Sequence, residues 1–198
     1  MTTTDILVIA GGTAAAHLAR SARVVLAEAE HAPGHHTTGR SAAIWIGACG
    51  PPDAQALARA SRGLLFAPPA GFTGVPLARP RIVPRLAPAD ETDSDPCDAA
   101  PDEYDVALGI ARAQQAREIE VRRVVRAWAG LRSVTPDRGL AIGQGRLPGL
   151  FWMAGQGGYG IQTSPAAGRL LVALVLKEAP EEAPLPVLGR LDPRSFPA

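Results

Sequence analysis

Residues 5–16 read Asp-Ile-Leu-Val-Ile-Ala-Gly-Gly-Thr-Ala-Ala-Ala, and residues 23–28 read Arg-Val-Val-Leu-Ala-Glu. The first stretch is rich in β-branched residues and has no breaker before Gly11-Gly12, so Asp5–Ala10 is predicted to be a buried strand. Ala and Leu side chains over Thr13–Arg20 favour a helix, and residues 23–28 are predicted to form a second buried strand. A strand, a glycine turn, a helix and a strand in this order are typical of a βαβ unit with a parallel sheet.

The turn after the first strand has part of the pattern that holds a nucleotide pyrophosphate. In a GxGxxG turn the free amides at the helix start face the anion, and an acid about 20 residues later binds the ribose. Here Ala10 stands at the first glycine position, Gly12 at the second and Ala15 at the third, while Glu28 ends the second strand. Nucleotide binding and a plain glycine turn are both compatible with this segment.

The rest of the chain alternates between regular and proline-rich segments. A Pro- and Asp-rich run over residues 84–102 predicts an extended connector, because it combines helix breakers with like charges. The elements expected around it are a helix at 55–66, a helix from 103 to about 123, strands near 127–134, 140–143 and 150–154, a helix at 165–177 with Ser164 as its N-cap, and an irregular tail from 179.

Composition excludes several classes of function. The formal net charge is +1 and the basic residues are scattered, so neither a nucleic-acid surface nor an anionic membrane surface is expected. No apolar run reaches the length of a membrane span, the N-terminus is unlike a signal peptide, and two cysteines fit a reducing compartment, so a cytoplasmic protein is expected. His35 and His36 would point to opposite faces of an extended segment, and no metal site is expected.

Four stretches, residues 5–16, 24–41, 128–143 and 148–168, carry a family resemblance. The last two include Trp-Ala-Gly-Leu-Arg at 128–132 and Ala-Gly-Gln-Gly-Gly-Tyr-Gly-Ile-Gln at 154–162. Together they resemble the flavin-dependent amino-acid oxidases and dehydrogenases, the group of glycine oxidase, sarcosine oxidase and D-amino-acid dehydrogenase. The resemblance implies an α/β Rossmann-like FAD-binding fold, with a parallel sheet flanked by helices.

The resemblance also implies roles for individual residues. Gly11, Gly12 and Ala15 would approach the FAD pyrophosphate, Glu28 with Ala29 the ribose, and Arg40 and Ser41 the pyrophosphate and flavin. The loop over the flavin would consist of Gly155, Gly157, Gly158, Tyr159, Gly160, Ile161 and Gln162.

Two of the implied roles concern the substrate, and each has an alternative. Arg132 would pair with the substrate carboxylate, for which a structural salt bridge is the alternative. Tyr159 would line the substrate cavity or simply pack as an aromatic. Covalent attachment of the flavin through His36 also stays open.

Family members are longer and carry a separate substrate domain. Here the resemblance stops near Arg81 and resumes near Leu86, which indicates a large internal deletion. We therefore expect one cofactor domain made of residues 1–83 and 103–178, joined by a connector at 84–102 and followed by a tail at 179–198.

Two functions are compatible with this organisation. The first is FAD-dependent oxidation of an amino acid or related amine, a small-molecule substrate. The second is a non-catalytic, truncated or engineered remnant of the fold. Loss of the covering domain would expose apolar surface and favour self-association.

Overall fold

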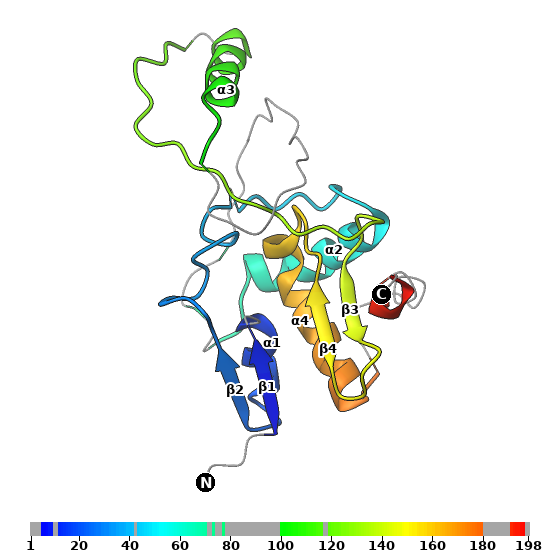
Figure 1. Cartoon of the computed structure of the whole chain (residues 1–198). Helices are drawn as coiled ribbons and strands as arrows, with labels where there is room; N and C mark the ends of the chain where they lie inside the picture. The colour runs from blue at the N-terminus through cyan, green and yellow to red at the C-terminus, as the bar shows by residue number, and fades with distance from the viewer. Residues whose placement is uncertain are drawn as a thin grey trace.

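The computed structural model describes residues 5–9, 12–41, 43–70, 73, 77, 100–116, 119–179 and 191–196. The elements along the chain are β1 (Ile6–Ile9), α1 (Gly12–Leu18), β2 (Val24–Ala27), α2 (Pro52–Phe66), α3 (Glu103–Ala116), β3 (Ala141–Gln144), β4 (Phe151–Ala154), α4 (Gly160–Leu176) and a 3-10 turn (Pro193–Ser195). In Figure 1, β1 and β2 lie beside each other, β3 and β4 form a second pair, and α3 stands apart from both.

The βαβ unit predicted from the sequence is present. Strands β1 and β2 pair in parallel, with Ile6 opposite Val24 and Ile9 opposite Ala27, and α1 connects them and packs on the sheet. At the start of the pair, Arg23 Nη2 lies 2.8 Å from Asp5 Oδ1. These elements confirm an α/β protein with a small parallel sheet and flanking helices, in keeping with a truncated Rossmann-like fold.

Helix α4 is the centre of the core. It packs on α1, on α2 and on the antiparallel pair of β3 and β4. The core around it consists of small and branched side chains, among them Leu57, Leu140, Ile142, Ala166 and Leu170. Alanines at the helix contacts let the helices approach closely, so the core is formed with few aromatic rings.

Two of the predicted elements are wrong in extent. Helix α3 ends at Ala116, and residues 119–123 are not helical, although the helix was expected to reach about residue 123. No residue of α3 is buried, so no tertiary contact extends the helix into the β-branched residues that follow. The strand expected at 127–134 is reduced to a single bridge between Val134 and Gln156, because this segment bonds to loops instead of to a neighbouring strand.

The last helix starts earlier in the sequence than Pro165, the expected first residue. Helix α4 begins at Gly160, so Ser164 lies inside it and is not its N-cap. Pro165 has no amide hydrogen to donate to the carbonyl of Ile161, four residues back. The Ser164 hydroxyl donates to that carbonyl over 3.2 Å, which provides it with a partner and lets the helix continue.

The remaining expectations concern α2, the tail and membrane spans. Helix α2 begins at Pro52, ahead of the expected start at Gln55, and the β3 and β4 strands lie where they were expected. In the tail, Leu191 is buried and its carbonyl accepts from Ile142 N at 2.8 Å. Ala10, Gly11, residues 78–83, residues 84–99 of the connector and residues 180–190 lie outside the described residues. Among the described helices, none has the length and apolar character that crossing a membrane requires.

Candidate active site

Two segments that are about 90 residues apart in the sequence are hydrogen-bonded to each other. The Thr37 hydroxyl donates to the carbonyl of Leu131 over 2.7 Å, and the Trp128 indole N–H donates to the carbonyl of Arg40 over 3.0 Å. The loop that follows β2 therefore lies along the Trp-Ala-Gly-Leu-Arg segment. Gly130 permits this approach, because a Cβ built there would lie 3.1 Å from Cβ of Arg40.

The glycine-rich loop between β4 and α4 also contacts the chain just after the Trp-Ala-Gly-Leu-Arg segment. Gly157 N donates to the carbonyl of Ser133 over 2.9 Å, next to the bridge between Val134 and Gln156. Gly155 and Gly157 have φ of +63° and +49°, in the left-handed region that favours glycine. The structure thus brings together three of the four stretches that the sequence singled out.

The Arg132 side chain lies against this glycine-rich loop. Its side chain is exposed, and its Nη1 lies 3.3 Å from the position that a Cβ on Gly158 would take. Any larger residue at position 158 would displace the guanidinium. The position of Arg132 therefore depends on the glycine, just before the first turn of α4.

A pocket of about 310 Å³ lies next to these hydrogen-bonded segments. Its lining comes from the loop after β2, from one residue that precedes α3 and from the segment before Gly130: Gly39, Arg40, Pro101, Arg126, Ala127, Trp128 and Ala129. The guanidinium of Arg126 stacks over the Trp128 ring, 5.6 Å from its centroid, and adds a second cation to the wall that contains Arg40. Sequence reasoning missed Arg126; its place two residues before Trp128 was the only available signal.

The N-terminal unit provides a cradle that a cofactor can approach. Gly12 begins α1 and is exposed; among the described residues, nothing beyond its chain neighbours and the helix's own backbone lies within 4 Å of a Cβ built on it, so the backbone there is accessible. Glu28 follows the last residue of β2, and its Oε1 accepts from Ala29 N at 2.9 Å and from Glu30 N at 3.2 Å. Because β1 and β2 are parallel, these two positions lie at the same edge of the sheet. Ala15 is buried behind them in α1.

Some residues of the implied flavin loop are engaged in packing. A Cβ on Gly50, which has φ of +92°, would lie 2.6 Å from Cε1 of the Tyr159 ring, and Tyr159 packs against the core. The buried Gln162 side chain accepts from Ile46 N over 2.8 Å. Ser41 Oγ accepts from Ala43 N over 3.1 Å and so closes its own loop. The side chains of Tyr159, Gln162 and Ser41 thus serve local structure, and Gly160 and Ile161 form the first turn of α4.

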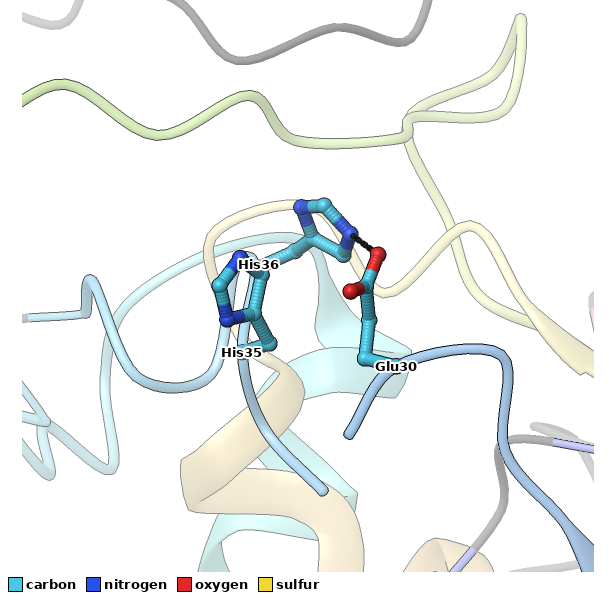
Figure 2. A group of neighbouring side chains, drawn as sticks. All are labelled: Glu30, His35 and His36. Atoms are coloured by element: carbon cyan, nitrogen blue, oxygen red, sulfur yellow. Dashed lines mark hydrogen bonds and ion pairs between the residues drawn. The ribbon is translucent and has the colours of Figure 1, made fainter. Parts of the chain in front are cut away.

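The histidines of the loop after β2 are arranged differently from the sequence expectation. Residues 33–40 form turns and not an extended segment, so His35 and His36 do not point to opposite faces. Their rings meet edge to face with centroids 4.9 Å apart, and Glu30 lies beside them (Figure 2).

A parallel βαβ unit with an accessible glycine at the start of its helix, an acid after its second strand and arginines around a nearby pocket define a nucleotide-cofactor-binding α/β protein. The family model described as FAD dependent oxidoreductase matches residues 68–174, more than half of the chain, and the chain belongs to this family. The cofactor of the family is FAD, and the accessible backbone at Gly12 together with the acid at Glu28 fits it. The matched residues include Arg132 and the glycine-rich loop, whereas the βαβ unit lies before them.

Proposed function

We propose that this FAD-dependent oxidoreductase oxidises an amino acid or a related amine, whose carboxylate Arg132 binds. The observation that carries the proposal is the exposed Arg132 guanidinium on the Gly158 backbone. A planar guanidinium offers two parallel donors to a carboxylate, which fixes both the position and the orientation of the substrate. Correct orientation over a cofactor is itself a large part of catalysis for a bimolecular reaction.

The same proposal assigns the cofactor contacts. Gly11, Gly12 and Ala15 would receive the pyrophosphate, Glu28 and Ala29 the ribose, and Arg40 and Ser41 the region between pyrophosphate and flavin. Gly155, Gly157 and Gly158 would let the backbone approach the ring, with Tyr159 to Gln162 behind them. The chemistry that bound FAD supplies is two-electron oxidation of the carbon next to the amine nitrogen.

The experiment has two stages. The purified protein is mixed with FAD, freed of unbound dye and examined for flavin absorbance; a colourless protein contradicts the cofactor assignment. The flavin-loaded protein is then mixed anaerobically with glycine, sarcosine and a panel of D- and L-amino acids. We expect one class to bleach the flavin, and a flavin that no amine bleaches contradicts the substrate assignment while leaving the cofactor assignment intact.

A second candidate is a non-catalytic remnant of the same fold, which we infer from the openness of the site. Trp128, which lines the pocket, is 54% exposed. The loss of a substrate domain between residues 84 and 102 would leave the site open to solvent. Oxidation of an amine requires a cavity that excludes water. Stable flavin binding without bleaching by any amine would favour this candidate.

Self-association is a further part of the proposal. Leu7, Ile9 and Val25 are 60%, 77% and 46% exposed on one face of the parallel sheet. Parallel sheets in proteins have both faces covered, and a net charge of +1 gives two copies little mutual repulsion. We propose that a second copy of the chain covers this face.

A further inference from the structure

Glu30, His35 and His36 form a compact group of possible metal ligands. One ligand atom from each residue lies within 4.8 Å of the other two, and His36 Nε2 is 2.7 Å from Glu30 Oε1. Figure 2 shows the carboxylate and the His36 ring facing each other, with the His35 ring beside them. Glu30 is half-buried and both histidines are exposed, so an ion can enter from solvent.

The backbone around the group is closed by hydrogen bonds. Gly39 N donates to the carbonyl of Gly34 over 2.7 Å, and Gly34 has φ of +80°, which allows the tight turn that carries both histidines. On the other side, Glu28 Oε1 accepts from Glu30 N over 3.2 Å and fixes the backbone of Glu30. The ligands are therefore held close together before any ion binds.

The turn is also attached to the rest of the protein. Thr37, next to His36, donates to Leu131 over 2.7 Å, and the His31 ring packs edge to face on His35 with centroids 5.3 Å apart. The hydrogen bond fixes the backbone next to His36, and the ring contact restricts the His35 side chain. Less conformational entropy then remains to be lost on binding, which favours affinity.

We infer that Glu30, His35 and His36 bind a divalent transition-metal ion of the zinc type. Two imidazoles and one carboxylate are the ligands of many zinc sites that keep a fourth position for water. Metal bonds of about 2.0–2.1 Å at a tetrahedral angle place ligand atoms about 3.3 Å apart, so the Glu30 and His36 atoms separate by only about 0.6 Å. Nitrogen ligands favour Zn²⁺, Ni²⁺ and Cu²⁺ over Mg²⁺ and Ca²⁺.

The ion has a structural consequence for the candidate active site. It would cross-link the end of β2 to the turn that ends at Arg40, and Arg40 lines the pocket beside Trp128. A bound ion would thereby stabilise the loop against the Trp128–Arg132 segment. None of the three ligands is among the residues proposed above to contact FAD or substrate, although Glu28 positions Glu30 and His36 is also the residue for which flavin attachment was considered.

Isothermal titration of tag-free protein with Zn²⁺ tests the inference, with Mg²⁺ as the hard-cation comparison. We expect one Zn²⁺ per chain, no heat from Mg²⁺ and a higher melting temperature with Zn²⁺. His35→Gln and His36→Gln should each weaken Zn²⁺ binding at least about tenfold, since even loss of an outer-shell partner costs that much. Absence of Zn²⁺ binding by the parent protein at about 1 mM, or binding by both variants as tight as that of the parent, overturns the site.

Two matched controls separate this site from other zinc ligands. His17→Gln removes the only histidine outside residues 31–36, and Cys49→Ser with Cys97→Ser removes both thiols; each should leave Zn²⁺ affinity unchanged. Because His35 and His36 are exposed, their variants should unfold like the parent protein in the absence of metal. Electron paramagnetic resonance of the Cu²⁺ form should show two coordinated nitrogens, reduced to one in His35→Gln; a spectrum without nitrogen coupling also contradicts the assignment.

Discussion

Gly168 of α4 lies directly against Thr13 of α1. A Cβ built on Gly168 would lie 2.9 Å from Cγ2 of Thr13 and 3.4 Å from its carbonyl carbon. The start of α1, where Gly12 is accessible, is therefore positioned by α4, whose own start carries the glycine-rich loop. One glycine thus connects the N-terminal cradle to the part of the chain that matches the family.

Gly168→Ala is expected to destabilise the protein by about 1–3 kcal/mol, because a methyl group in this contact forces the two helices apart. It should also weaken FAD binding, since α1 must shift. Gly63→Ala is the matched control: within the part of the chain that the structure describes, only chain neighbours and the backbone of α2 itself lie near a Cβ built on Gly63, so alanine there should stabilise by about 0.5–1 kcal/mol. Denaturant unfolding and flavin titration measure both effects, and equal stability of the two variants contradicts this account.

The parts of the fold that could be predicted from the sequence are those with a local signal. The β-branched runs at Ile6–Ile9 and Val24–Ala27 and the glycine turn between them predicted the parallel pair correctly. The strand near 127–134 was wrong because only Trp128 and Val134 favour a strand there, and the partner that decides the conformation is a loop, reached through Thr37 and Leu131. Such a long-range contact leaves no periodic pattern in the sequence.

The same dependence on long-range contacts explains which parts of the candidate site could be predicted from the sequence. Arg132 and the glycine-rich loop could be singled out as motifs, but the stacking of Arg126 on Trp128 depends on tertiary structure. The cluster of Glu30 with His35 and His36 was missed because a turn, and not an extended segment, holds the histidines. Turn geometry that rests on hydrogen bonds between distant segments is weakly encoded in local sequence.

The ion pair between Asp5 and Arg23 should set the pH at which the Asp5 carboxyl, at the edge of the parallel sheet, takes up its proton. The Arg23 guanidinium and amide donate to the carboxylate, which lowers the pKa of Asp5 from 3.8 to about 2. The folded carboxyl takes up its proton at lower pH than the unfolded one. The stabilisation is therefore complete above pH 3.8 and is lost as the pH falls through about 2.

Carbon NMR of the Asp5 carboxyl should show this low midpoint. In Arg23→Gln the midpoint should rise toward the ordinary value for aspartate, while the backbone amide of residue 23 still donates to the carboxylate and keeps the midpoint below that value. Arg20→Gln leaves the ion pair intact and serves as the control. A midpoint near 4 in the parent protein contradicts the ion pair.

Protonation of His17 in α1 should lower the free energy of unfolding in mildly acidic solution. Burial lowers the pKa of His17 below its ordinary value of 6.5, and the positive charges of Arg169 and Arg20 lower it further. The unfolded chain therefore binds this proton first as the pH falls below 6.5, so stability is lost from 6.5 downward through the folded pKa. His17→Gln should reduce the loss between about pH 7 and about pH 5. Chemical denaturation at each pH measures the difference, and parallel curves for parent and His17→Gln contradict it.

The exposed face of the parallel sheet predicts the state of association. Ile9→Lys places a charge on the face that Leu7 and Val25 share, where burial against a second copy would then cost more than it gains. Light scattering after size exclusion should show a smaller assembly for Ile9→Lys than for the parent. Val125→Lys, at an apolar residue that is 83% exposed outside this sheet, controls for a general gain in solubility. A monomeric parent protein at all concentrations rules out the proposed association.

Arg132 should determine how the carboxylate of the substrate is recognised. Arg132→Met removes a charge-assisted, bidentate interaction worth about 1.5–3 kcal/mol, so kcat/KM for the amino-acid substrate should fall about 10- to 100-fold, mainly through KM. Arg132→Lys keeps the charge but loses the paired geometry, and should recover only part of the loss. The corresponding amine without a carboxylate should be oxidised equally by all three proteins, because it makes no contact with the guanidinium. Arg132 is exposed, so the variants should keep the melting temperature of the parent. An equal loss for substrate and amine would place Arg132 in a structural role and contradict carboxylate binding.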